Sequence, residues 1–216
     1  MTLEEKLLAL DVEGFYIEES VLSPMQAKEV HTSTKATLLG GAEKIFGSTF
    51  LNHNQSLAPY LANHKIMEVV RSILGPNSRI ISTSGNMSPP SPGAKSAPPG
   101  NLHVDWPWGQ SGASYIEGTL PNVVINLTTF WILTDFTRQN GATIVSPGTH
   151  KAGKNPNGYP ALKKARPTEI QVEAPAGSVL MFDGRLWHKG GTNRSTAPRI
   201  FWGVNYAPWW LNCHAR

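Results

Sequence analysis

The sequence has 216 residues, of which 40% are hydrophobic and 16% are charged, and its formal net charge is +4. This composition supplies enough apolar residues for one packed domain and excludes a disordered chain or a coiled coil. The basic residues are not clustered as they are in nucleic-acid-binding surfaces, and the 17 prolines and 20 glycines favour turns and short strands.

The cellular setting is predicted from what the sequence lacks. No apolar run approaches the 18 residues of a membrane span, and the acidic N-terminal segment has no signal-peptide core. The single cysteine, Cys213, excludes a disulfide within the chain and a cysteine-based zinc site. We therefore expect a cytoplasmic protein with no membrane or nucleic-acid partner, as a monomer or a homodimer.

The first third of the chain is predicted to be mostly helical. Helical spacing of apolar residues predicts helices at 3–10, 24–39 and 58–75, while 13–22 has the pattern of a strand and 41–56 has no clear pattern. Ser23 is the expected N-cap of the second helix, with Pro24 in its first position. Gly75 and Pro76 are expected to end the third helix.

The character of the sequence changes after Arg79. Residues 79–87 have the pattern of a strand, and residues 87–100 contain five prolines, which exclude a helix or a central strand. A long loop of this kind is typical of a lid over a site, and a surface linker is the alternative.

The remaining residues predict a mainly β fold. Short extended runs alternate with turns, at 101–106, 122–135, 141–147, 168–174, 178–183 and 199–207. Closely spaced strands of this kind are typical of a sandwich or a jelly roll. We expect one domain over 1–216, in which helices of 1–78 support a β core formed by 79–216.

Three residues suggest a metal site. In an extended strand His103 and Asp105 share a face, because side chains alternate with a period of two. His188 is the best candidate for a third ligand. Two histidines and one carboxylate are the ligand set of non-haem iron(II) oxygenases, and they leave open positions for a co-substrate and oxygen.

Arg199 adds a cation to this set. The segment after His188 is turn-like, and a strand resumes at Arg199, so the guanidinium is able to face the same cavity. A guanidinium binds a carboxylate in a two-pronged way. 2-Oxoglutarate, whose distal carboxylate needs a cation while its other end binds iron, meets this description.

The sequence resembles the phytanoyl-CoA dioxygenase family of iron- and 2-oxoglutarate-dependent oxygenases. The resemblance covers nearly the whole chain and rests on LHVDW, TFWILTDFTRQNGATIVSPGTHK and GSVLMFDGRLWHKGGTNRSTAPRIFW, with EGFYIEESVLSPMQAKEV and VVRSILGP near the N-terminus. It implies a double-stranded β-helix (a cupin-like jelly roll) with the metal at one open end. It also implies that His103, Asp105 and His188 bind Fe(II) and that Arg199 binds 2-oxoglutarate.

The resemblance suggests further co-substrate contacts on one strand. It places Phe130 where the family contacts the co-substrate, and Asn126 and Thr128 then face the same side. The alternative is that the two polar residues are ordinary strand residues bonded to their neighbours.

A second group of residues is assigned to the substrate. Ser84 and Asn86 are expected to line the same pocket, and Trp106 or Trp108 is expected to border it. His150 is interpreted as a structural residue of a turn or loop. Core packing is expected for Trp187, Trp209 and Trp210.

The predicted reaction is hydroxylation, or cyclisation or desaturation, of a small metabolite or natural-product intermediate, with O2 consumed and succinate and CO2 released. The resemblance excludes halogenation, because related halogenases have glycine or alanine in place of the Asp105 carboxylate. Two alternatives are a cupin-type metalloprotein that needs no 2-oxoglutarate and a non-catalytic binding or sensor module. The intact ligand set and Arg199 disfavour both.

Overall fold

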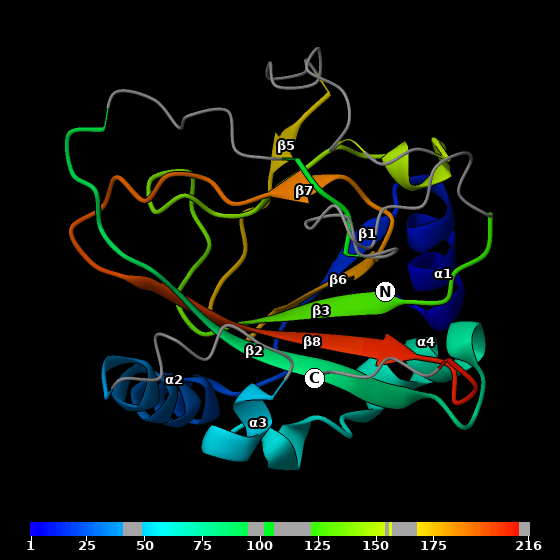
Figure 1. Ribbon diagram of the computed structural model, residues 1–216, viewed down its shortest axis with the longest axis horizontal. Helices are drawn as coiled ribbons and strands as arrows, with labels where there is room; N and C mark the ends of the chain where they lie inside the picture. The colour runs from blue at the N-terminus through cyan, green and yellow to red at the C-terminus, as the bar shows by residue number, and fades with distance from the viewer. Residues whose placement is uncertain (41–48, 95–101, 106–121, 154–155, 157–167, 212–216) are drawn as a thin grey trace.

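The protein is built from a helical layer and two antiparallel sheets (Figure 1). The computed structural model describes residues 1–40, 49–94, 102–105, 122–153, 156 and 168–211. Its helices are α1 (Leu3–Val12), α2 (Pro24–Leu39), α3 (Phe50–His53) and α4 (His64–Leu74), with short 3-10 helices η2 (Ala58–Tyr60) and η3 (Thr149–Lys151). Its strands are β1 (Phe15–Glu18), β2 (Arg79–Ser88), β3 (Leu127–Ile132), β4 (Ile144–Val145), β5 (Ile170–Gln171), β6 (Val179–Asp183), β7 (His188–Lys189) and β8 (Arg199–Ala207).

The strands form a large and a small sheet. The large sheet has the order β1-β6-β3-β8-β2, and the small sheet has the order β5-β4-β7. Helices α2, α3 and α4 cover one face of the large sheet, and the small sheet lies on the side of its other face (Figure 1). The predicted mainly β, jelly-roll architecture is confirmed, although the two sheets do not join into a closed barrel among the described residues.

The main core lies between the helices and the large sheet. Side chains of one parity along β3, β6 and β8 are buried there, namely Leu127, Trp131, Val179, Met181, Ile200, Trp202, Val204 and Tyr206. They meet the apolar side of α4, where Ile66, Val69, Val70 and Leu74 are buried. The opposite parity, which we call the inner face, points toward the small sheet and carries the candidate site.

Local sequence signals set the helix starts. Ser23 caps α2 as predicted: its side chain accepts a hydrogen bond from the backbone of Gln26, and the Gln26 side chain accepts one from the backbone of Ser23. Pro24 occupies the first turn, where its missing N–H costs nothing. Thr2 and Glu5 form the same reciprocal cap on α1.

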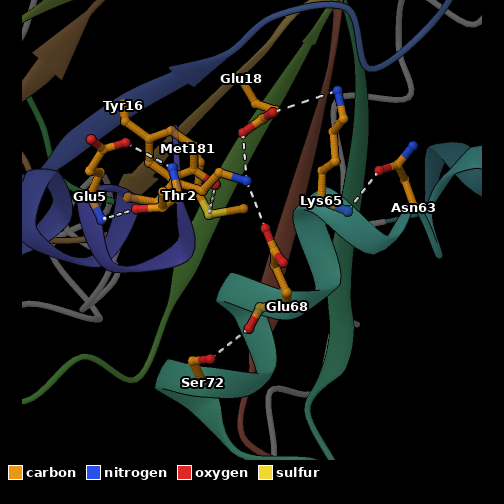
Figure 2. A network of polar contacts seen from close by, with 10 residues as sticks. Thr2, Glu5, Tyr16, Glu18, Asn63, Lys65, Glu68, Ser72 and Met181 are labelled. Atoms are coloured by element: carbon orange, nitrogen blue, oxygen red, sulfur yellow. Dashed lines mark hydrogen bonds and ion pairs between the residues drawn. The ribbon is translucent and has the colours of Figure 1, made fainter.

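A buried ion network joins α1, β1 and α4 (Figure 2). The Lys6 ammonium lies 2.9 Å from Glu18 and 2.7 Å from Glu68, and Lys65 lies 3.8 Å from the other oxygen of Glu18. Lys6 is almost completely buried. Because a buried ammonium is tolerated only when paired, the network specifies how the two helices meet the edge of the large sheet.

Several predicted elements are shorter than expected. The predicted strand 13–22 is limited to β1, because the chain leaves the sheet near Ser20, which has a left-handed φ of 55°. The predicted helix 58–75 is interrupted, because Asn63 caps a new helix, α4, by accepting a hydrogen bond from the backbone of Lys65. The prediction for 79–87 is confirmed by β2, whereas part of the predicted loop 87–100 lies outside the described residues.

The helical N-terminal third and the β core share one sheet. Strand β1, from the N-terminal third, pairs with β6 through four residue pairs. The division at residue 78 is therefore not a structural boundary within this sheet, and the single domain over 1–216 stays a prediction. Across the described part of the chain, no helix has the length and apolar character needed to cross a membrane.

Candidate metal and co-substrate site

Three potential metal ligands converge between the two sheets. One ligand atom from each of His103, Asp105 and His188, together called the triad below, lies within 4.8 Å of the others. The Nε2 atom of His188 is 3.5 Å from Oδ1 of Asp105, and the two imidazole rings are 4.2 Å apart between centroids. This is a grouping of the kind that one metal ion requires.

Backbone pairing brings these distant segments together. His103 and His188 exchange two backbone hydrogen bonds of 3.0 Å, so the short 102–105 segment lies beside β7. The backbone N–H of Asp105 donates to the carbonyl of Gly184 at 2.7 Å. Asp105 lies in a turn and not in a strand. The 102–105 segment is therefore held by the backbone hydrogen bonds of His103 to His188 and of Asp105 to Gly184.

His188 is prepared to act as a ligand. Its Nδ1 lies 2.9 Å from the carbonyl oxygen of Leu186, so Nδ1 carries the proton and Nε2 presents its lone pair toward Asp105. Burial, and secondly the neighbouring His103, lower the pKa of His188 to about 4. The imidazole is therefore neutral at physiological pH, which is the form that binds metal.

Arg199 presents an unpaired cation to the same interior. It is 3% exposed, and its Nε and Nη1 atoms have no hydrogen-bond partner among the described residues. Its guanidinium carbon lies 5.0 Å from the centre of the Phe136 ring and 5.6 Å from that of Phe201. Burial lowers the pKa of Arg199 to about 10, so the group remains protonated, and no carboxylate of the described residues forms an ion pair with it.

Aromatic rings connect Arg199 to the triad. The Phe130 ring lies 4.6 Å from Phe201 and 6.2 Å from the ring of His188. Phe182 packs against both Phe130 and His188, at 5.0 and 4.7 Å. The space between the triad and the guanidinium is thus bounded by apolar rings, which make the surroundings less polar and strengthen electrostatic interactions.

The register of strands β3, β8 and β2 determines which side chains meet on the inner face. Thr128, Asn205 and Ser82 lie opposite one another across β3, β8 and β2. In the next row of that face Phe130 lies opposite Gly203, and Gly203 opposite Ser84. A side chain at Gly203 would approach the Ser84 hydroxyl, at 2.7 Å from its Cβ, so glycine allows these side chains to converge.

The polar residues predicted on this face have different surroundings. Thr128 contacts the triad directly, since its Oγ1 lies 2.6 Å from Oδ2 of Asp105. Asn126 donates to the carbonyl of Tyr206 at 3.2 Å and to Oδ1 of Asn205 at 3.4 Å, which matches the interpretation as a strand residue bonded to its neighbours.

Ser84 and Asn86 lie farther along β2 on the same face. The amide nitrogen of Asn86 donates to the Ser84 hydroxyl at 2.9 Å, and both residues are partly exposed. Their assignment to the substrate stays a prediction. Trp106 and Trp108 lie outside the described residues.

The remaining predicted residues have structural positions or surface positions. His150 is buried outside the triad, with Nε2 3.0 Å from the carbonyl oxygen of Asp11. Trp187 is buried with Leu102 and Val104, as predicted. The core prediction is wrong for Trp209 and Trp210, which are 62% and 57% exposed because β8 has ended at Ala207.

Two site residues, Phe201 and Asn205, were not predicted. Both share the parity of Arg199 along β8, where successive side chains alternate between faces. Counting in steps of two from Arg199 reaches Phe201 and Asn205, so the signal was present in the sequence. Only the pairing with β3 identifies the face as the one beside the triad.

Comparison with known proteins agrees with the fold and the family. The sequence profile described as phytanoyl-CoA dioxygenase (PhyH) matches residues 12–201. A curated relative, dioxygenase af480 of Aspergillus fumigatus, is 32% identical over 139 residues, which are 62% of this chain and 38% of the relative. The chain therefore spans well under half of that relative's length.

Solved structures share the fold at low sequence identity. The epimerase SnoN, solved with Fe3+, 2-oxoglutarate and nogalamycin RO, has a TM-score of 0.71 and 17% identity, over 95% of this chain and 83% of SnoN. HygX of Streptomyces hygroscopicus, solved with nickel, 2-oxoglutarate and hygromycin B, has a TM-score of 0.64 and 16% identity, over 98% of this chain and 89% of HygX.

Proposed function

Since the chain belongs to the phytanoyl-CoA dioxygenase family, we propose that it is an Fe(II)- and 2-oxoglutarate-dependent oxygenase. Its substrate is a small metabolite or natural-product intermediate, which it hydroxylates, cyclises or desaturates. The observation that carries the proposal is a triad of two histidines and one carboxylate that faces the same interior as a buried guanidinium, whose Nε and Nη1 have no hydrogen-bond partner among the described residues.

The residues fit the two groups. His103, Asp105 and His188 supply two nitrogens and a carboxylate oxygen to Fe(II), which leaves positions for a chelating co-substrate and O2. Arg199 offers two unpaired N–H donors to the distal carboxylate of 2-oxoglutarate. When bound, the iron supplies O2 activation coupled to the oxidation of 2-oxoglutarate to succinate and CO2.

The protein contributes orientation and a dry site. The hydrogen bond from Nδ1 of His188 to the Leu186 carbonyl fixes the direction of Nε2. An ion pair with Arg199 would fix the position of the distal carboxylate of 2-oxoglutarate. Phe130 and Phe201 line the space between them. Asp105 keeps a carboxylate where halogenases of related type have none, which favours oxygenation.

The substrate class draws on the structural neighbours. SnoN and HygX were solved with nogalamycin RO and hygromycin B respectively. The partly exposed Ser84 and Asn86 extend the inner face away from the triad with neutral hydrogen-bonding groups, which suit a polar, uncharged substrate.

The decisive experiment reconstitutes the protein with Fe(II) and 2-oxoglutarate and screens substrates by mass spectrometry. We expect a product that has gained one oxygen atom or lost two hydrogens, together with succinate, and we expect His188→Ala to abolish both. Retained activity in His188→Ala would contradict the metal assignment. Oxygen uptake without 2-oxoglutarate would favour the cupin-type alternative, and the absence of succinate with every substrate would favour a binding module.

A further inference from the structure

The two oxygens of Asp105 have different surroundings. Oδ1 faces Nε2 of His188 at 3.5 Å, whereas Oδ2 accepts a hydrogen bond from Oγ1 of Thr128 at 2.6 Å. We propose that Thr128 is a positioning residue, which holds Oδ2 so that Asp105 binds the metal through Oδ1 alone. The proposal rests on the metal site proposed above and assigns Thr128 to the metal ligand instead of to 2-oxoglutarate.

Thr128 is itself held in place. It is buried near the start of β3, and Asn205 of β8 lies opposite it with Oδ1 2.7 Å from the Thr128 hydroxyl. The amide nitrogen of Asn205 lies 2.9 Å from the hydroxyl of Ser82 on β2. A polar row therefore runs across three strands of the large sheet and ends on the carboxylate of Asp105.

The single proton of the Thr128 hydroxyl can be donated to only one of the acceptors around it. A threonine hydroxyl has one proton, but three acceptors lie within hydrogen-bonding distance of the Thr128 hydroxyl: Oδ2 of Asp105 at 2.6 Å, Oδ1 of Asn205 at 2.7 Å and Oδ1 of Asn126 at 3.3 Å. The carboxylate is charged and is the stronger acceptor. The Thr128 proton therefore lies toward Oδ2 of Asp105, while Asn205 donates to the Ser82 hydroxyl at 2.9 Å and accepts from the amide nitrogen of Asn126 at 3.4 Å.

The hydrogen bond to Oδ2 affects how Asp105 would bind a metal ion. A charge-assisted hydrogen bond fixes the plane of the Asp105 carboxylate and occupies Oδ2, which leaves Oδ1 as the oxygen that faces the metal position. A carboxylate that bound through both oxygens would occupy one more position on the metal. Binding through one oxygen keeps three positions open, as a chelating co-substrate and O2 require.

The test is Thr128→Val, which removes the hydroxyl and keeps the shape. We expect the affinity for Co(II), measured with a competing chelator, to fall about 10- to 100-fold, as for other residues that orient metal ligands. Thr128→Ser, which restores the hydroxyl, is expected to recover it. Wild-type Co(II) affinity in Thr128→Val, or no recovery in Thr128→Ser, would overturn the proposal.

The neighbouring residue provides a matched control. Thr129 is equally buried, but it faces the helices, where its hydroxyl donates to the carbonyl of Val204 and accepts from Trp131. Thr129→Val is expected to lower the free energy of unfolding while leaving Co(II) affinity unchanged. An equal loss of Co(II) affinity in Thr129→Val would mean that the effect of Thr128→Val is a general packing defect, and would overturn the proposal.

Asn205→Leu tests the row independently of any folding defect in Thr128→Val. Because Asn205 acts through Thr128, we expect a smaller loss of Co(II) affinity, and no additional loss when Asn205→Leu is combined with Thr128→Val. Additive losses would overturn the row. Failure of the wild-type protein to bind Co(II) in a manner abolished by His188→Ala would contradict the proposed metal site itself, a result distinct from failure of the Thr128 role.

Discussion

Arg199 is expected to lower the free energy of unfolding of the protein without co-substrate. It is also expected to be essential for binding 2-oxoglutarate. The fall of its pKa to about 10 on burial corresponds to roughly 3 kcal/mol of lost solvation of the charged form. Its contacts with the rings of Phe136 and Phe201 offset about 1–2 kcal/mol of this. Arg199→Met keeps a long side chain between the rings and removes the charge. We therefore expect this variant to be more stable than the wild type by roughly 1–2 kcal/mol when no co-substrate is present.

The same variant is expected to lose co-substrate affinity. Removing one partner of a buried, hydrogen-bonded charge pair costs about 2–5 kcal/mol. Since each 1.4 kcal/mol is a factor of ten, the Kd for 2-oxoglutarate is expected to rise by at least about 30-fold. Titration calorimetry of the Ni(II)-loaded protein measures this Kd, and urea unfolding of the ligand-free protein measures the stability.

An exposed arginine supplies the control. Arg138 is paired with Glu173 at the surface, 3.2 Å away, with both side chains more than half exposed. Arg138→Met is expected to leave both the Kd for 2-oxoglutarate and the free energy of unfolding almost unchanged. An unchanged Kd in Arg199→Met would refute the assignment of Arg199 to the co-substrate, and a large loss of ligand-free stability would refute the claim that its charge lacks a partner.

Three further predictions concern the scaffold and the metal. Lys6→Met, which leaves Glu18 buried without its main partner, is expected to lower the free energy of unfolding by roughly 3 kcal/mol, and adding Glu18→Gln is expected to recover part of the loss in urea denaturation. Gly85→Ala places a methyl group against the buried ring of Phe50 and is expected to lower the free energy of unfolding by about 1–3 kcal/mol in the same assay. The control variant Gly190→Ala, whose methyl group would lie in open space, is expected to lower it far less. Removing metal with a chelator is expected to abolish most of the rise in Tm that 2-oxoglutarate causes, and a rise that persists would place the co-substrate away from the triad.

Features that depend on a few neighbouring residues could be predicted from the sequence. Ser23 and Pro24 identify the start of α2 because capping is a local hydrogen-bonding requirement. The extended run 199–207, which follows a turn-like segment, identifies β8 over its whole length, and none of its residues is exposed because both faces of the strand are covered. The residue pattern and the resemblance to a family identified His103, Asp105 and His188 as the proposed metal ligands and Arg199 as the proposed partner of 2-oxoglutarate.

Other features depend on which strands pair, and a sequence does not state this. Thr128 was predicted to contact the co-substrate, and this stays a prediction, whereas its hydrogen bond to Asp105 depends on how the turn at Asp105 meets β3. Asn205 has the right parity, but its role depends on the register that places it opposite Thr128.

The sequence by itself thus determined the candidate ligand types, which are side-chain identities, together with the cap of α2 and the extent of the long strands, which are set by residues close together in the chain. The tertiary structure decided that Oδ2 of Asp105 is bonded to Thr128 while Oδ1 faces His188, and that Nε and Nη1 of Arg199 are buried with no hydrogen-bond partner among the described residues. The physical reason is that hydrogen bonding and desolvation depend on distances between segments far apart in the chain, which only the packing of the two sheets sets.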